Sequence, residues 1–281
     1  ELKVKDRLNL SSGMGEMEVR NQLKYLAGCN IDTENYPCFL GAGAYDHYIP
    51  AALEQLLLRS EFYTAYTPYQ PEISQGILQS IFEYQTMICK LTGLDVSNAS
   101  MYDGGSSLAE ACSLACANSK NKNKVVISDT VHPEYLDILK AYALSGHMEI
   151  VVVPGQDGHS DIDAMVKAID NETACAVIQQ PNFYGILEDP TAVEKAIHEN
   201  KGMFIMSVEP LSLALLKSPA EWGADIAVGE GQSLGINLSF GGPYLGFMAA
   251  NKALMRKIPG RIVGQTTDLD GKRAFVLTLQ A

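Results

Sequence analysis

The sequence predicts a doubly wound α/β domain, in which a mostly parallel sheet carries helices on both faces. Four short runs, VVIS, IVVV, AVIQ and FIMSV, are almost entirely apolar and lack the polar alternation of a half-exposed strand. Strands of a parallel sheet that is covered on both faces have this composition. After Tyr102 the runs alternate with segments of helical period, which favours parallel strands joined by crossover helices.

The longest predicted helix, at residues 71–91, illustrates how the start and the end of each element are predicted from the sequence. In residues 71–91 large apolar side chains recur every three or four positions, as on one buried helix face. Pro71 suits the first helical position, where its missing N–H costs nothing, and Gly93 suits the stop. The same reasoning predicts helices at 16–27, 49–59, 106–117, 133–145, 162–170 and 190–200, and strands at 124–128, 149–153, 175–179, 203–208, 225–228 and 244–249.

Composition divides the chain into two parts. Residues 1–48 predict an N-terminal arm with a short helix, and residues 49–281 predict one large domain. Around the boundary, between residues 38 and 70, glycines, prolines and closely spaced tyrosines exclude a long regular element.

The charge and the cysteines limit the possible partners and the compartment. The 281 residues include 33 acidic and 21 basic ones, for a net charge of −12. Such a surface repels phosphate backbones and anionic lipid, so we expect neither nucleic acid nor membrane as a partner. No apolar run approaches the roughly 20 residues that cross a bilayer, and ELKVKDRLNL lacks the apolar core of a signal peptide. The cysteines form no CxxC pair, which predicts reduced thiols in a cytoplasmic protein.

The loops that follow the strands are where a sheet of this class binds ligands. The segment 102–107 opens a predicted helix with Gly104, Gly105, Ser106 and Ser107. The glycines allow close approach of the backbone, and free N–H groups together with the helix dipole favour an anion. The residues fit a phosphate cradle and a plain serine-capped helix start equally well.

Further loops place a histidine and a carboxylate after strands. His132 follows the predicted strand 124–128, where it could lie flat on an aromatic ligand or carry a proton, with a capping or structural role as the alternative. Glu209 follows the predicted strand 203–208, where it could hold a ring nitrogen or a hydroxyl, or simply face solvent. A fourth loop, 229–246, has more glycines than ordinary packing requires.

Together these loops have the layout of a fold-type I pyridoxal-phosphate (PLP) enzyme. Such an enzyme needs a phosphate-binding helix start, a ring stacked on the cofactor, an acid for the pyridine nitrogen and a lysine for the Schiff base. The first three have candidates, but no lysine occurs in 218–251, where Gln232 or Ser233 stands near the expected position. Lys217 and Lys252 flank this gap and are poorly placed. We therefore expect no catalytic residue on this chain alone.

Several long blocks carry a specific resemblance. FLGAGAYDHYIP, YTPYQPEISQG, FEYQTM, KLTGLDVSNASMYDG, GQSLGINLSFGGPYLGFMA and RIVGQTTDLDGKRAFVLTLQA are similar to the non-PLP subunit, subunit 1, of the glycine cleavage system P-protein family, glycine dehydrogenase (decarboxylating). The resemblance runs from Leu8 to Ala281. In that family a homologous partner, subunit 2, carries PLP and its lysine, so the missing lysine agrees with the resemblance.

The resemblance implies a role in an oxidoreductase of glycine catabolism, an α2β2 heterotetramer with active sites near the subunit interface. Such a complex decarboxylates glycine, releases CO2 and passes the aminomethyl group to the lipoyl arm of H-protein. PLP is then bound by the partner subunit, and none is expected on this chain. The family continues past LTLQA into an Arg-rich motif and a small C-terminal domain, so we expect that domain and a short N-terminal segment to be absent from this sequence.

Two groups of residues have expected roles in such a complex. Loop-borne aromatic and polar residues suit interfaces better than cores, although a plain helix start at Pro71 is the alternative. The residues expected at the shared interface are Tyr66, Tyr69, Gln70 and Glu72. The residues expected as relics of a cofactor pocket, empty or partly filled by side chains, are Gly104, Gly105, Ser106, Ser107, His132 and Glu209.

Three alternative functions can be weighed against the sequence. A stand-alone binding or regulatory protein, built on a catalytically dead PLP-enzyme fold, would need no partner subunit. A nucleotide-dependent enzyme would need a P-loop lysine or a GxGxxG fingerprint, and the sequence has neither. A metal enzyme would need paired ligands, but the histidines are scattered without HxH or HxxxH spacing, so no metal is expected.

Overall fold

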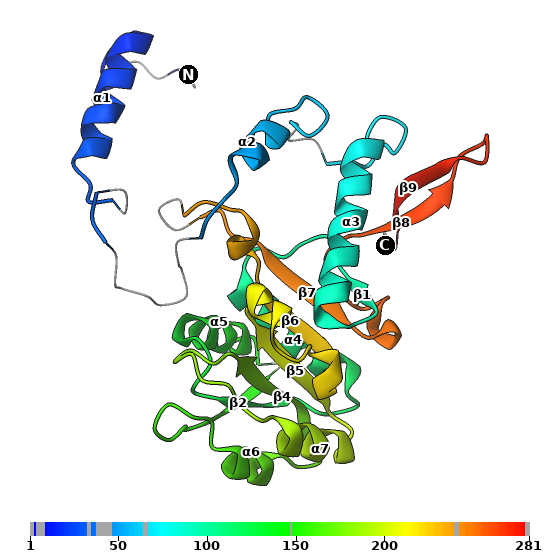
Figure 1. Cartoon of the computed structure of the whole chain (residues 1–281). Helices are drawn as coiled ribbons and strands as arrows, with labels where there is room; N and C mark the ends of the chain where they lie inside the picture. Colours follow the sequence, from blue (N-terminus) through cyan, green and yellow to red (C-terminus); the bar gives the residue numbers. More distant parts are fainter. Residues whose placement is uncertain are drawn as a thin grey trace. The chain divides into compact units, whose positions relative to one another are not determined.

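The computed structural model describes residues 3, 9–32, 35–37, 47–63, 67–146, 148–238 and 242–278. Internal contacts divide the chain into two compact units, Glu1–Gly41 and Ala42–Ala281. Helix α1, Glu16–Gly28, belongs to the first unit, and all of its residues are exposed. The second unit holds the sheet and every other described element (Figure 1).

Seven strands of the described chain form one sheet in the order β1-β7-β6-β5-β4-β2-β3. Five neighbouring strands, from β3 to β6, are parallel, whereas β7 runs antiparallel to β6 and β1 antiparallel to β7. The predicted α/β fold with a mostly parallel sheet is therefore confirmed. The strands are β1 (Val96–Ser97), β2 (Lys124–Ser128), β3 (Glu149–Val153), β4 (Thr173–Gln180), β5 (Met203–Val208), β6 (Ile226–Glu230) and β7 (Gly246–Ala250).

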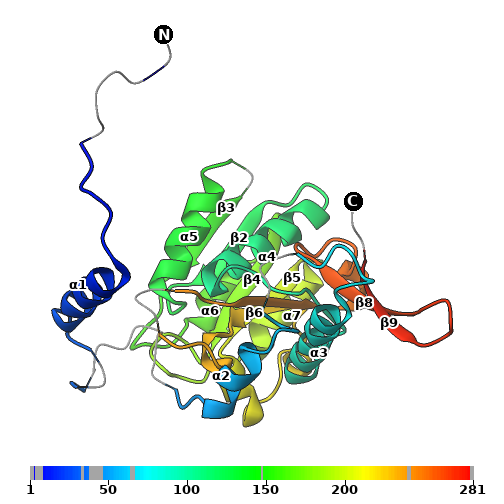
Figure 2. The ribbon, with the colours of Figure 1, turned by 90° about the horizontal axis from the view of Figure 1, so that it is seen from above.

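Helices cover both faces of this sheet, as the apolar strands require (Figure 2). Side chains alternate between the faces. In β2, for example, Val125 and Ile127 belong to the core beneath α4 and α5, and Val126 belongs to the core beneath α3, α6 and α7. The helices are α2 (Ala51–Leu57), α3 (Gln75–Thr92), α4 (Gly104–Asn118), α5 (Pro133–Ala143), α6 (Ile162–Ala168) and α7 (Thr191–Glu199).

The start of α3 corrects one expectation. Pro71 does not occupy the first helical position, because residues 71–74 form a turn and the helix begins at Gln75. The Ser74 N–H donates to the Pro71 carbonyl, an i to i+3 pattern that precedes the helix. At the other end Gly93 adopts φ 74°, the left-handed conformation expected of a helix stop.

A hairpin of β8 (Ile262–Thr267) and β9 (Arg273–Thr278), which the sequence reasoning did not predict, packs on α3. Two glutamines of the helix bind its backbone. The Gln85 side chain donates to the Val263 carbonyl at 3.0 Å and accepts from the Val263 N–H at 2.9 Å. Gln75 makes the same paired contact with Phe275, at 2.9 and 2.8 Å. Each strand of the hairpin is thus fixed to α3 by one glutamine.

Two further findings concern the described chain as a whole. None of its helices combines the length and the apolar character needed to cross a membrane. The five cysteines that the structure describes are free thiols.

Candidate functional site

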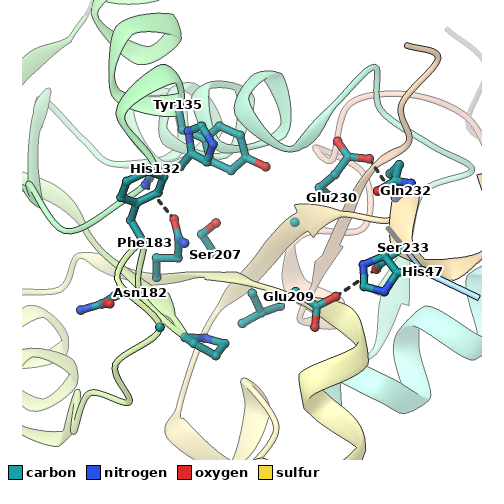
Figure 3. Close-up of a pocket in the computed structure, with 15 residues that line it drawn as sticks. His47, His132, Tyr135, Asn182, Phe183, Ser207, Glu209, Glu230, Gln232 and Ser233 are labelled. Atoms are coloured by element: carbon teal, nitrogen blue, oxygen red, sulfur yellow. Dashed lines mark hydrogen bonds between the residues drawn. The ribbon is translucent and has the colours of Figure 1, made fainter. Parts of the chain in front are cut away.

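A cavity of about 250 Å³ lies beyond the carboxyl ends of β4, β5 and β6, at the edge of the sheet where ligands of α/β proteins bind (Figure 3). His132, Glu209, Gln232 and Ser233 line it, so the structure brings together residues from three of the four loops that the sequence indicated. No lysine or arginine is among the described residues that line this cavity.

His132 forms one wall of the cavity and serves the protein's own packing. Its ring stacks on Tyr135, with the centroids 4.7 Å apart and the planes at 22°, and meets the edge of Phe183 at 5.0 Å. Its Nδ1 accepts from the Glu134 N–H at 3.2 Å, which caps α5, and its backbone N–H donates to Gln179 Oε1. One ring face therefore already lies against a side chain of this chain.

Glu209 directly follows β5 and is exposed at the cavity mouth. Its Oε2 accepts from the Ser212 N–H at 2.7 Å, which caps the short 3-10 helix Pro210–Ala214. Its Oε1 accepts from the Ser233 hydroxyl at 2.9 Å, a contact across neighbouring loops. Both oxygens of this carboxylate thus have partners within the protein.

The glycine and serine residues of 104–107 form the first turn of α4. Asp103 caps this helix, since its Oδ1 accepts from the Ser106 N–H at 2.7 Å and its carbonyl accepts from the Ser107 hydroxyl at 2.7 Å. Gly104 and Gly105 are buried and do not line the cavity. The segment is a capped helix start whose glycines allow close packing.

Two side chains of α5 cover these glycines. A Cβ atom at Gly104 would collide with the Tyr135 hydroxyl, and one at Gly105 would lie 2.5 Å from Ile138. Burial raises the pKa of Tyr135, and the nearby Glu230 charge adds to this rise, so the hydroxyl stays protonated. The N-terminus of α4 is therefore closed off by neutral side chains on this side.

Glu230, the last residue of β6, is a site residue that the sequence reasoning missed. Its Oε2 accepts from the Gly104 N–H at 3.0 Å, and its Oε1 accepts from the N–H groups of Gln232 at 2.9 Å and Leu245 at 2.8 Å. Burial raises the pKa of Glu230, the three N–H donors oppose that rise, and the Asp103 charge adds to it. The available signal was an acid at the end of a buried strand, inside the glycine-rich loop 229–246.

Gln232 occupies the wall where a Schiff-base lysine was expected. It is 5% exposed, and its amide donates to the Ile236 carbonyl. Lys217 does not line the cavity, and its ammonium lies 4.0 Å from the centroid of the Trp222 ring. Neither of these side chains offers an amine to the cavity.

Lys252 lies at the opposite end of the sheet. Because β7 is antiparallel to β6, Gly246 pairs with Glu230 beside the cavity, whereas Ala250 pairs with Ile226 at the start of β6. That register separates the two ends by about 13 Å along the strand. Since Lys252 follows Ala250, its side chain starts from the wrong edge to reach the cavity.

The expected interface residues lie apart from the cavity. Tyr69, Gln70 and Glu72 are exposed on the segment before α3, and none of them lines the cavity. Tyr66 lies outside the described residues. The Tyr69 hydroxyl accepts from Arg261 Nη2 at 2.7 Å, and the guanidinium lies 5.3 Å from the Tyr69 ring centroid. In the described ranges no cluster of His, Cys, Asp and Glu side chains could hold a metal ion.

Comparison with known proteins decides the family. The chain matches the profile of the glycine cleavage system P-protein over residues 1–281. It belongs to the glycine cleavage system P-protein family. A "probable glycine dehydrogenase (decarboxylating) subunit 1" of Syntrophomonas wolfei is 64% identical over 280 residues, which are 100% of this chain and 64% of the relative. A protein of the same name from Carboxydothermus hydrogenoformans is 56% identical over 281 residues, 100% of this chain and 63% of the relative. This member of the P-protein family thus spans less than two thirds of these relatives.

A solved structure of the same family agrees with this assignment. A crystal structure titled glycine decarboxylase (P-protein) of the glycine cleavage system, in inhibitor-bound form, superposes with a TM-score of 0.92 at 43% identity, over 99% of this chain and 62% of that one. A sphingosine-1-phosphate lyase of Burkholderia pseudomallei superposes with a TM-score of 0.66 at 14% identity, over 98% of this chain and 66% of that one, and it shares the fold alone. The P-protein chain thus has the PLP-transferase-like fold predicted from its loops.

Proposed function

We propose that this chain is the PLP-free half of a two-subunit glycine decarboxylase. In the complex a second, homologous subunit binds PLP, and the pair decarboxylates glycine, releases CO2 and passes the aminomethyl group to lipoyl H-protein. Membership of the P-protein family and the relatives named subunit 1 support this proposal. The observation that carries it is the missing amine, since Gln232 stands in the cavity wall where a Schiff-base lysine belongs.

The residues around the cavity do not fit PLP, which supports a cofactor site on the partner. A Schiff base needs a primary amine, and none of the described residues that line the cavity carries one. A cofactor phosphate needs free N–H groups at a helix start, but the Gly104 N–H is already bound to the Glu230 carboxylate. Asp103 adds a second negative charge beside that position. We therefore assign His132, Glu209 and the start of α4 to a relic of a cofactor pocket that the protein's own side chains fill.

What this chain contributes is then structural. Tyr69, Gln70 and Glu72 present exposed aromatic, amide and carboxylate groups on one segment, a composition suited to a subunit interface. Tyr69 is 54% exposed although its hydroxyl is fixed by Arg261, so the side chain is held in place while its surface is available. Such preorganised aromatic groups contribute strongly to binding. We propose that this segment contacts the PLP-binding subunit.

The first experiment compares the purified chain with and without subunit 2, each with added PLP. We expect no visible absorption band of lysine-bound cofactor from the chain alone, and no exchange of glycine carboxyl with labelled bicarbonate. With subunit 2 both should appear. A cofactor band or exchange from this chain alone would contradict the proposal. Failure to bind subunit 2 would instead favour the stand-alone binding or regulatory protein.

The interface assignment has its own test. Tyr69→Phe and Gln70→Ala should each weaken association with subunit 2 by roughly tenfold, because truncation of an interface anchor costs about 1–2 kcal/mol. Tyr63→Phe is the matched control, since Tyr63 is 76% exposed in the same loop region. Association would be measured by titration calorimetry, and exchange activity on the assembled complex. Equal affinity of all three variants and the wild type would remove the interface role.

A further inference from the structure

The N-terminus of α4 has backbone donors of the kind that bind an anion, and a carboxylate of the chain itself accepts from them. The first N–H groups of a helix lack intrahelical acceptors and carry the positive end of the helix dipole. In α4 the Gly104 N–H donates to Glu230 and the Ser106 N–H donates to the Asp103 cap. A carboxylate from β6, distant in sequence, therefore accepts from the first N–H of α4, a kind of donor that binds phosphate at helix N-termini.

The same carboxylate holds both ends of the glycine-rich loop. Oε1 of Glu230 accepts from Gln232 where the loop leaves β6, and from Leu245 just before it enters β7. The Gly231 N–H donates to the Leu245 carbonyl at 2.6 Å, so the two ends also bind each other. The partly buried Glu230 side chain thus links the start of α4, the end of β6 and the two ends of the loop 231–245.

Within the described part of the chain, no cationic side chain of a lysine, arginine or histidine pairs with this carboxylate. The described ionisable groups that interact electrostatically with Glu230 are Asp103, Tyr135 and Tyr84, none of which is cationic. The three backbone donors and the helix dipole are therefore what stabilises the carboxylate, which is the way an oxyanion is bound in a ligand site.

We propose that Glu230 is a built-in substitute for a bound phosphate, which completes the start of α4, closes the loop 231–245 and excludes phosphate-bearing ligands from this chain. Its role is a positioning one. It follows from the contacts of this chain alone and does not depend on whether the chain pairs with subunit 2. A direct consequence is that removal of the side chain uncovers three N–H donors around a space of carboxylate size, which a small anion from solution can fill.

Anion rescue of Glu230→Ala tests this proposal. In chloride at mildly alkaline pH, the melting temperature of the variant should fall by roughly 5–10 °C, because buried donors lose their acceptor in a chain of this size. Formate, acetate or inorganic phosphate, added at constant ionic strength, should raise it again with a saturating dose dependence, since a ligand of the native state stabilises by mass action. The wild type should show no such rise, because its site is filled.

Two variants make the result specific. Glu209→Ala removes an exposed carboxylate that accepts from the Ser212 N–H of a short 3-10 helix and from the Ser233 hydroxyl, so it should melt close to the wild type and gain nothing from formate. Glu230→Gln keeps the size but places an amide donor or a weaker acceptor opposite three N–H groups, so it should be destabilised without rescue. If Glu230→Ala does not fold in chloride, its refolding yield in formate replaces the melting temperature as the readout.

Three outcomes would overturn the role of Glu230. They are a Glu230→Ala variant as stable as the wild type, a formate-dependent rise of equal size in variant and wild type, and a Glu230→Gln variant with wild-type stability. The role of Glu230 would also be overturned if formate, acetate and phosphate had no effect on the melting or refolding of Glu230→Ala. All of these are measured without subunit 2, so they are independent of the decarboxylase assay.

Discussion

Replacement of Gln85 by methionine should loosen the β8–β9 hairpin from α3. Gln85 is 7% exposed and provides both the acceptor for the Val263 N–H and the donor to the Val263 carbonyl. Val263 is 1% exposed, so water cannot readily replace these bonds. Methionine keeps the length and volume of the side chain and removes only its hydrogen-bonding groups, which makes the substitution a test of the two bonds.

The expected magnitude follows from these contacts. Each buried backbone group left without a partner costs about 1–3 kcal/mol, and the apolar replacement recovers part of that cost, so the net loss should be about 2–4 kcal/mol. For a chain of this size the melting temperature should fall by roughly 5–10 °C. Gln79→Met is the matched control on the same helix, since Gln79 donates to Glu83 in solvent, and its effect should stay within about 0.5 kcal/mol.

Thermal unfolding gives the global effect and amide exchange gives the local one. In the Gln85 variant the Val263 amide should lose protection before the amides of β4 and β5, because those strands do not depend on the hairpin. The reasoning would be refuted if Gln85→Met and Gln79→Met melted together, or if the Val263 amide kept its wild-type protection.

Three further predictions concern other parts of the fold. Burial opposes the charged form of His198, but its hydrogen bonds and charge pairing with Asp225 and Glu194 outweigh this and raise its pKa above 6.5. The stabilisation that charged His198 gives the folded state is therefore complete below about pH 6.5, and it is lost as the pH rises through the raised pKa. Melting temperatures should therefore fall with rising pH in that window for the wild type and less for His198→Gln, and parallel pH profiles would contradict this. Gly246→Ala should destabilise by about 1–3 kcal/mol in urea unfolding, because its Cβ would lie 2.6 Å from a backbone carbon at the start of α4, and an unchanged midpoint would count against that contact. Gly76→Ala, at a helical position with open space around the added Cβ, should instead stabilise by about 0.5 kcal/mol, and a lower midpoint would show that the site is not open.

The sequence predicted most of the sheet because its strands are buried on both faces. Strands 124–128, 203–208 and 149–153 were predicted with their observed bounds, since continuous apolar runs between polar residues leave little choice. The β8–β9 hairpin was missed although Asp270-Gly271 is a turn signal, because polar and apolar residues in β8 do not alternate regularly. The helix expected from Pro71 begins later because proline at that point is equally suited to a turn.

The site was predicted less completely than the fold. Loop position identified His132, Glu209 and Gln232 as cavity residues, because the carboxyl ends of parallel strands meet at one edge. Their contacts could not be predicted, since those of His132 with Phe183 and of Glu230 with Gly104 join loops that are distant in sequence. Only the packed structure shows that a strand-end carboxylate lies on the start of α4.

The N–H groups of Gln232 and Leu245 both donate to Oε1 of Glu230. This arrangement affects which insertions the protein can tolerate during evolution. A loop whose two ends are clamped at a single atom is closed whatever its length, and the entropy of closing a longer loop grows only slowly. Insertions between those two residues should therefore leave the sheet intact. The stretch is a place where new sequence can be acquired at a small cost in stability.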